Sequence, residues 1–145
     1  MAKPYNVKYA PGTEAPKTLE DHPFYGFTLD EEQIAFRDAI WDPEKLIVFC
    51  NARAGTGKTF IATATADLLV KYGRYDGIVY ISSPTQEQKL GFLPGEIEDK
   101  TAVYSEPFME ALMKININPQ TAVHQYDIMN QKMVLVILMP LHMFI

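Results

Sequence analysis

The stretch Ala52-Arg53-Ala54-Gly55-Thr56-Gly57-Lys58-Thr59 decides the fold of this chain. It follows an apolar run at residues 46–50 and opens a helix-like run at 60–72. A strand, a glycine-rich turn ending in Gly-Lys-Thr and a helix are together the architecture of a phosphate-binding loop, or Walker A motif. The order predicts a core strand over 46–51. It also predicts a helix that starts at Lys58 and ends at Gly73, where glycine suits a left-handed C-terminal cap.

The chemistry of this loop predicts a nucleoside triphosphate with Mg²⁺ as the ligand. Consecutive backbone N–H groups form an anion nest, and the helix adds the positive end of its dipole. Gly55 and Gly57 permit backbone conformations that a side chain would forbid. Lys58 is expected to reach the β- and γ-phosphates and Thr59 to ligate Mg²⁺. The loop-lining set is therefore predicted to be Ala52, Arg53, Ala54, Gly55, Thr56, Gly57, Lys58 and Thr59.

The loop departs from the usual pattern at its first residue, where Ala52 replaces glycine. Alanine is the smallest substitute, so the loop should survive if Ala52 keeps a negative φ. The alternative is a chance Gly-Lys-Thr on an ordinary turn. The apolar run before the loop and the helical run after it both argue against that alternative.

Length and composition predict one globular domain. The chain has 145 residues, of which 48% are hydrophobic, and its net charge is −5, so no global basic field favours nucleic acid. The single cysteine, Cys50, is expected to be a buried strand residue and excludes a disulfide within one chain. The start of the chain lacks the apolar core of a signal peptide, and the apolar stretch 133–145 is too short to span a bilayer. A cytoplasmic protein without a membrane partner is the expectation.

The remaining pattern divides the chain into three parts. We expect an N-terminal arm at 1–27, extended and partly ordered near residues 24–27, a partial nucleotide-binding domain at 28–125, and an atypical hydrophobic tail at 126–145. The tetrad from Thr28 to Glu31 resembles a capping box for a helix that ends near Trp41, before Asp42-Pro43. Four residues of that helix are expected to be buried in part, namely Ile34, Phe36, Ala39 and Ile40.

Further along, residues 77–82 predict a second buried strand of a parallel sheet. A strand, helix and strand over 46–82 would form a right-handed crossover. Residues 91–95 carry two glycines and a proline and predict a loop. Residues 96–114 look helical, with a break or kink at Pro107.

Two stretches resemble one family. The segment Lys89-Leu90-Gly91-Phe92-Leu93-Pro94-Gly95-Glu96-Ile97-Glu98-Asp99-Lys100 is similar to a signature of PhoH-like proteins, and so is a continuation with Tyr104, Pro107, Phe108, Ala111 and Leu112. With the loop, the resemblance covers residues 28 to about 114. It implies an α/β P-loop NTPase with a RecA-like, helicase-related three-layer core, incomplete in this chain, and ATP and Mg²⁺ as ligands. Some members act on RNA, so RNA or single-stranded nucleic acid is an implied partner. RecA-like ATPases often complete their site between subunits, which leaves a homo-oligomer open.

The resemblance gives Gln33 a candidate role, because an upstream glutamine reads adenine in RecA-like helicases. A side-chain amide can donate to adenine N7 and accept from the exocyclic amine. A solvated helix glutamine is the alternative. Phe24, Tyr25 or Phe27 could stack on the base, or pack in the core or against a partner. Ser83 stands where the family usually has arginine, which puts any phosphate or nucleic-acid contact by that arginine in doubt.

The sequence shows no acidic motif to hold Mg²⁺ and polarise the attacking water, which ATP hydrolysis needs. Asp127 does not follow an apolar strand, and the apolar run 133–139 ends in Pro140 without an acid. The arginines Arg37, Arg53 and Arg74 have no context that supports an arginine finger. We therefore expect ATP binding with impaired hydrolysis. A non-hydrolysing binding module that acts with a partner and a P-loop kinase of small metabolites are the alternatives.

The tail after Lys132 carries no charge and shows neither helix nor strand periodicity. A reading frame shifted by one base would encode a peptide that resembles the PhoH-like segment before the acidic motif. One hypothesis is therefore a one-base slip near Lys132 that truncates an ATPase core. The alternative is a genuine hydrophobic terminus that packs on the exposed edge of the sheet. An uncovered edge and an apolar tail predict poor solubility or self-association.

Overall fold

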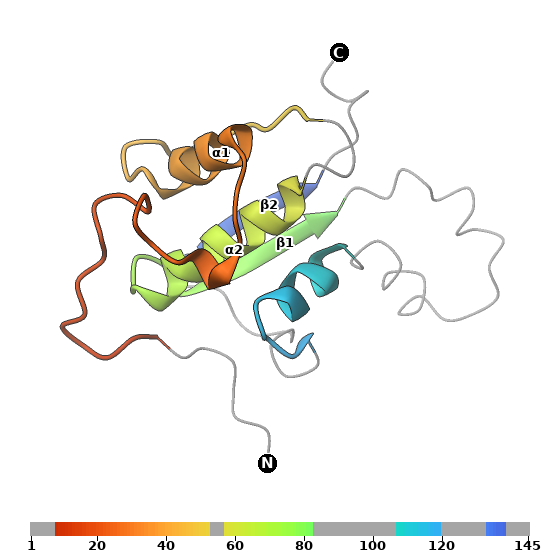
Figure 1. Cartoon of the computed structure of the whole chain (residues 1–145). Helices are drawn as coiled ribbons and strands as arrows, with labels where there is room; N and C mark the ends of the chain where they lie inside the picture. Colours follow the sequence, from red (N-terminus) through yellow and green to blue (C-terminus); the bar gives the residue numbers. More distant parts are fainter. Residues whose placement is uncertain (1–7, 53–56, 83–106, 120–132, 139–145) are drawn as a thin grey trace, which may run out of the picture.

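The computed structural model describes residues 8–52, 57–82, 107–119 and 133–138. In chain order these residues form a short 3-10 helix η1 (Phe24–Gly26), the helices α1 (Glu31–Trp41) and α2 (Lys58–Lys71), and the strands β1 (Gly77–Ser82) and β2 (Met133–Leu138). A further helical stretch covers 107–114. Figure 1 shows α2 lying along the two strands, with α1 beside it.

Helix α1 begins at a capping box two residues later than the sequence analysis predicted. Asp30, rather than Thr28, is the N-cap, and its Oδ1 accepts the backbone N–H of Gln33 at 2.8 Å. In return the Gln33 side-chain oxygen accepts the N–H of Asp30 at 3.1 Å. This register puts a carboxylate at the cap and Glu31 and Glu32 in the first turn, where the helix dipole favours negative charge. The predicted end is confirmed, because Asp42 is the C-cap before Pro43.

Helix α2 has the predicted bounds to within two residues. It starts after Gly57, and its C-terminus closes at Gly73, which has φ +81°. The N–H of Gly73 donates to Val70 O and that of Arg74 to Leu69 O, both at 3.0 Å, which is the Schellman arrangement. Residues 63–70 are all buried, so α2 is covered on every side and forms the centre of the molecule.

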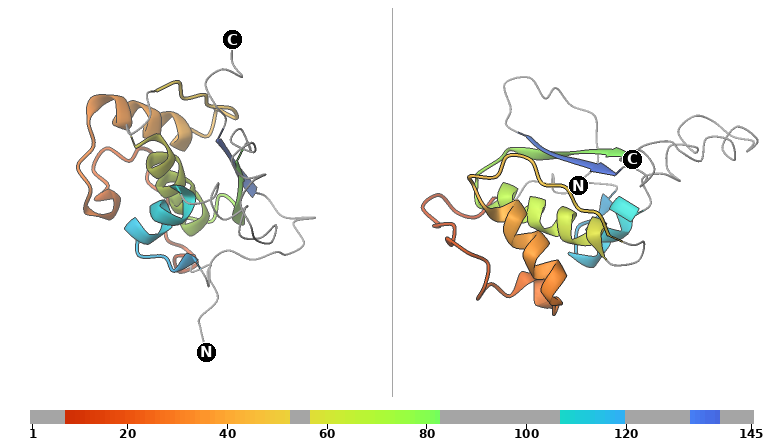
Figure 2. Two further views of the ribbon diagram at one scale, coloured as in Figure 1. Left: turned by 90° about the vertical axis from the view of Figure 1, so that its right-hand side faces the viewer. Right: turned by 90° about the horizontal axis from the view of Figure 1, so that it is seen from above.

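The strands β1 and β2 form a two-stranded parallel sheet, in which Gly77 lies opposite Met133 and Ser82 opposite Leu138. Strand β1 confirms the predicted strand at residues 77–82, but not its predicted burial, because Ile81 is 45% exposed. In the views of Figure 2 the described helices all lie on one side of this sheet. Of the three layers expected for the fold, the described residues therefore show a sheet covered by helices on one face, with α1 packed on α2 behind it.

The predicted core strand over residues 46–51 is wrong. This segment has no strand assignment, and three of its apolar side chains are largely exposed: Leu46 at 88%, Ile47 at 75% and Phe49 at 78%. A strand needs a neighbour to satisfy its backbone groups, and in the described part of the chain β1 pairs with β2 instead. The strand, helix and strand crossover predicted for residues 46–82 therefore lacks its first strand.

The tail forms a strand although its pattern did not indicate one. Residues 133–138 pair with β1 along its whole length, as the alternative of a hydrophobic terminus on the sheet edge anticipated. Pairing with β1, rather than a periodic pattern of its own, makes this segment a strand. The one-base slip itself stays a prediction.

Two residues upstream of α1 belong to the hydrophobic core. Leu19 is fully buried and Phe24 is 1% exposed. They pack with residues of α1, α2 and the 107–114 helix, and the cluster comprises Leu19, Phe24, Trp41, Ile61, Ala64, Leu68, Leu69, Phe108, Leu112 and Ile115. Segment 8–27 is thus fixed to the helices by side-chain burial. The partial order predicted near residues 24–27 is present as η1.

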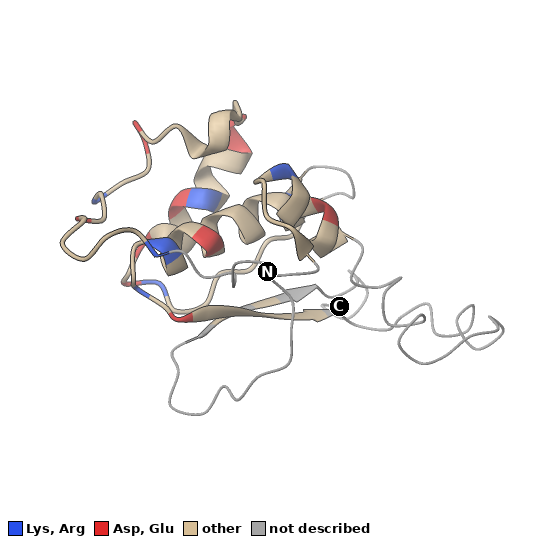
Figure 3. Ribbon diagram, turned by 90° about the horizontal axis from the view of Figure 1, so that it is seen from below, with Lys and Arg blue, Asp and Glu red and all other residues tan. Residues whose placement is uncertain are grey.

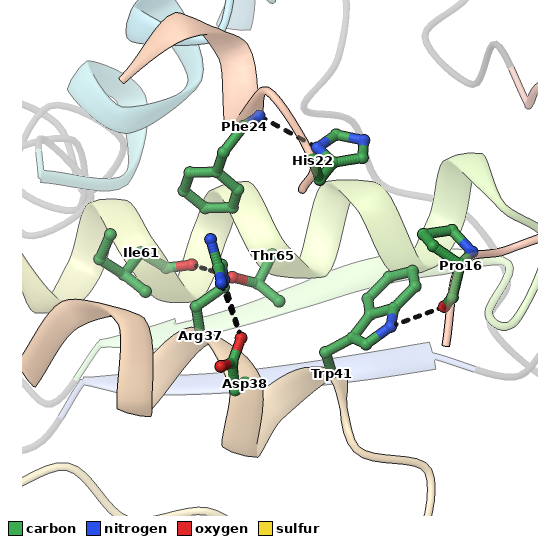
Figure 4. A network of polar contacts seen from close by, with 8 residues as sticks. All are labelled: Pro16, His22, Phe24, Arg37, Asp38, Trp41, Ile61 and Thr65. Atoms are coloured by element: carbon green, nitrogen blue, oxygen red, sulfur yellow. Dashed lines mark hydrogen bonds and ion pairs between the residues drawn. The ribbon is translucent and has the colours of Figure 1, made fainter. Parts of the chain in front are cut away.

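The buried face of α1 contains an arginine and a tryptophan that the predicted set of partly buried residues did not include. Arg37 is 4% exposed, lies 5.7 Å from the ring centre of Phe24 and pairs with Asp38 at 2.9 Å (Figure 4). Trp41 is 2% exposed, and its indole N–H donates to Pro16 O at 3.0 Å (Figure 4). Ile34, by contrast, is 38% exposed.

A second arginine has a structural role beside Trp41. The Arg74 guanidinium lies 5.0 Å from the ring centre of Trp41 and donates to its backbone oxygen at 2.6 Å. Arg37 and Arg74 are therefore both engaged within the fold. Arg53 lies outside the described residues.

Candidate nucleotide-binding site

The two ends of the glycine-rich loop are joined by a hydrogen bond. The Lys58 ammonium donates to the backbone oxygen of Ala52 at 3.0 Å, which brings the seventh residue of the octapeptide onto the first. Ala52 is not among the described non-glycine residues with positive φ, which are Phe24, Tyr25 and Asn116. The middle of the loop, Arg53, Ala54, Gly55 and Thr56, lies outside the described residues.

Gly57 forms the junction between the loop and α2. It is the N-cap of the helix, has φ +84°, and its oxygen accepts the N–H of Ile61 at 2.9 Å. A β-carbon at this position would lie 2.9 Å from the side-chain nitrogen of Gln33. The left-handed backbone conformation therefore favours glycine at residue 57, and a side chain there would displace the Gln33 amide.

The structure brings Gln33 to the loop, as the predicted site requires. Its side-chain oxygen accepts the N–H of Asp30, while its side-chain nitrogen faces Gly57. Gln33, Gly57, Lys58 and Ala52 are thus gathered at the N-terminus of α2, although Gln33 is 24 residues away from Gly57 along the chain. Adenine reading by Gln33 stays a prediction.

Thr59 lies in the first turn of α2 and is half-buried. A hydroxyl there, together with phosphate oxygens and water, suits Mg²⁺, which is held by few protein ligands in nucleotide sites. The nearby Cys50 thiol is a weaker candidate for metal chemistry. Burial raises its pKa, against the opposing effect of the Lys58 charge, so the thiol stays protonated. Among the described residues no group of three or more His, Cys, Asp or Glu could hold a metal ion.

The three aromatic residues proposed for base stacking have different environments. Phe24 is 1% exposed and belongs to the core. The Tyr25 hydroxyl donates to the Asp67 carboxylate. Phe27 is 40% exposed and packs edge-on against Phe60 of α2, with ring centres 4.7 Å apart. Phe27 is therefore the accessible ring of the three.

A buried acidic residue on α2 was missed by the sequence analysis. The Asp67 side chain is 1% exposed and pairs with Lys71 at 2.9 Å, one helical turn later. The Lys71 ammonium also lies 4.9 Å from the ring centre of Tyr25. An Asp and a Lys four residues apart in an otherwise apolar helix could have indicated this pair.

The charged residues of the described part are distributed over several elements. In Figure 3, Lys and Arg lie apart on the helices and on the segment before α1, with Asp and Glu among them. The segments of both strands contain no charged residue. No helix in the described ranges is long and apolar enough to cross a membrane.

A buried helix that begins at Gly57-Lys58 and lies beside a parallel sheet agrees with the P-loop class of α/β proteins, although the strand expected before the loop is absent from the described residues. The family model described as PhoH-like protein matches residues 28–142, and the chain belongs to this family. The match confirms the resemblance and extends it beyond residue 114 to include β2.

Curated relatives agree with this assignment. The chain is 36% identical over 76 residues to the PhoH-like protein of Synechocystis sp., which covers 51% of the chain and 23% of the relative. It is 34% identical over 86 residues to Protein PhoH of Escherichia coli, with 59% and 24% coverage. Identity to the PhoH-like protein of Bacillus subtilis is 38% over 68 residues, with 46% and 21% coverage. The matched part spans about a quarter of each relative. No solved structure shows a significant match.

Proposed function

We propose that this PhoH-like protein binds ATP with Mg²⁺ through the loop from Ala52 to Thr59. The observation that carries the proposal is the hydrogen bond from Lys58 to Ala52 O, which joins the two ends of the loop at the N-terminus of α2. The lysine is thereby held at the mouth of the loop, where its charge can neutralise phosphate oxygens. Family membership supports the same ligand class.

Each part of the site has a separate task in this proposal. The N-terminus of α2 offers backbone N–H groups and the positive end of its dipole to the phosphates. The Thr59 hydroxyl would hold Mg²⁺, which supplies neutralisation of the phosphate charge. Gln33 would contact the base and Phe27 would offer its exposed ring to it.

We infer that ATP hydrolysis is impaired in this chain. The strand beside β1 would be expected to deliver the acid that holds Mg²⁺ and orients water. Strand β2 has no carboxylate in residues 133–138, and residues 139–145 have none either. The prediction is that ATP binds and is not turned over.

Calorimetric titration with ATP and Mg²⁺ tests the binding proposal. Lys58→Ala should lower the affinity at least tenfold, because the ammonium is the only side-chain cation placed at the described part of the loop. Lys45→Ala is the matched control, since Lys45 is exposed and its ion pair among the described residues is with Asp42. Circular dichroism should show that both variants are folded. Absence of ATP binding by the unmodified chain, or equal affinity in Lys58→Ala, would refute the proposal. Hydrolysis is tested by measuring the release of phosphate from ATP in the presence of the unmodified chain. We expect no release above the background without protein.

A further inference from the structure

The cap of α1 and the phosphate loop share one side chain. Gln33 is the third residue of α1, and its side-chain oxygen accepts the N–H of Asp30 at 3.1 Å. Its backbone N–H in turn donates to the Asp30 carboxylate at 2.8 Å. This reciprocal pair fixes the Gln33 side chain over the first turn of α1.

The pair also decides which end of the Gln33 amide faces the loop. A carboxamide has an accepting oxygen at one end and a donating nitrogen at the other. Because the oxygen is turned toward the Asp30 N–H, the nitrogen is the end that lies against Gly57. The contact is close, since a single added carbon on Gly57 would come within 2.9 Å of that nitrogen.

A movement of the Gln33 side chain would affect the loop through Gly57. It has φ +84° and caps α2, and the next residue, Lys58, is bonded to the first residue of the loop. A Gln33 amide that leaves its position removes the packing on one side of Gly57. Among the described contacts, Gly57 then keeps the hydrogen bond from the Ile61 N–H to its oxygen.

We propose that Asp30 is a positioning residue for the phosphate loop, acting through Gln33 on Gly57. Its cap holds the Gln33 amide against Gly57 and so keeps Gly57 and Lys58, at the start of α2, in place for phosphates; this last step rests on the proposed function. Asp30 itself needs no contact with the ligand. Local opening of the first turn of α1 is therefore expected to be accompanied by local opening at the end of the loop.

Hydrogen exchange of the ligand-free protein tests the coupling. Asp30→Ser keeps a side-chain acceptor at the N-cap, whereas Asp30→Ala removes it. Loss of an N-cap corresponds to about a fivefold change in local opening. In Asp30→Ala we expect exchange to rise about fivefold at Ile34 of α1 and also at Ile61 of α2, whose N–H groups donate to Asp30 O and Gly57 O, with wild-type exchange in Asp30→Ser. A rise confined to α1 would overturn the proposal.

Titration with inorganic tripolyphosphate and with ATP, each with Mg²⁺, separates loop positioning from base reading. Asp30→Ala should weaken both ligands by the same factor, because the loop binds the phosphates of each. Weaker ATP binding with unchanged tripolyphosphate binding would show that Asp30 affects only the base contact, and would overturn the proposal. If the unmodified chain binds neither ligand, the proposed function fails, while the exchange experiment still decides whether Asp30 holds the loop.

Discussion

The side-chain nitrogen of Gln33 lies 2.9 Å from the place where a β-carbon on Gly57 would stand. This contact joins the first turn of α1 to the first turn of α2 across the phosphate loop. A side chain at residue 57 would therefore displace the Gln33 amide, a consequence that the sequence motif alone does not contain.

Gly57→Ala should destabilise the protein more than Gly73→Ala does. Both glycines have a left-handed φ, +84° and +81°, but a β-carbon on Gly73 meets nothing within 4 Å. The conformational cost common to both is about 1–2 kcal/mol, and crowding against Gln33 should add about 1 kcal/mol or more at residue 57. Urea unfolding of the two variants measures the difference. It should shrink in a Gln33→Ala background, and an equal cost at both glycines would contradict the contact.

Leu19→Ala should be strongly destabilising, whereas Leu46→Ala should be nearly neutral. Leu19 is fully buried in the core, and Leu46 is 88% exposed. The expected losses in unfolding free energy are about 2–5 kcal/mol for Leu19 and within about 0.5 kcal/mol for Leu46. Thermal or urea unfolding checks both. Sequence reasoning alone would have ranked the two leucines in the opposite order, so the comparison tests the fold directly.

Lys71→Met should cost far more stability than Lys8→Met. The two ion pairs have similar lengths, 2.9 Å for Lys71 with Asp67 and 3.0 Å for Lys8 with Asp76. They differ in burial, because the Asp67 side chain is 1% exposed and the Asp76 side chain 43%. Removing the ammonium beside a buried carboxylate, which keeps the Tyr25 hydroxyl as a donor, should cost about 3 kcal/mol, and loss of the exposed pair under about 1 kcal/mol. Similar unfolding free energies for the two variants would argue against the burial of Asp67.

The stability of the protein should fall as the pH drops below about 6.5, in part through His22. Its Nδ1 accepts the N–H of Phe24 at 3.0 Å, so the ring is neutral in the fold. Burial, then the charges of Arg37 and Lys71, lower the His22 pKa from its ordinary value of 6.5. Between the lowered pKa and 6.5 the unfolded chain binds a proton that the folded chain does not, so acidification favours unfolding.

His22→Asn is the control for this pH dependence. The asparagine oxygen can accept the Phe24 N–H and does not titrate. Unfolding free energies measured from pH 7 to pH 5 should decline less steeply in this variant than in the unmodified chain. Equal slopes would show that His22 does not contribute.

The parts of the fold that the sequence predicts well are those set by local chemistry. Helix α2 is delimited by Gly57 and Gly73, two positions where only the backbone of glycine is easily accommodated. The end of α1 follows from Asp42-Pro43 in the same way. Its start was misplaced because two overlapping tetrads, beginning at Thr28 and at Asp30, both satisfy the capping pattern.

The parts that the sequence did not predict depend on distant partners. Residues 46–51 have the composition of a core strand, yet a strand forms only where another strand pairs with it. The tail lacks any periodic pattern and is a strand because β1 lies beside it. Within the site, the approach of Gln33 to the loop followed from family resemblance, whereas the role of Asp30 required the geometry of the amide.

Trp41 is the only tryptophan in the chain, and it joins three separate segments. It belongs to α1, its indole holds Pro16 before that helix, and Arg74 after α2 lies on its ring. Its emission spectrum should therefore be that of an indole shielded from water, and it should shift to the red when any one of these segments detaches. The protein thus carries an intrinsic optical reporter of whether its N-terminal segment is docked.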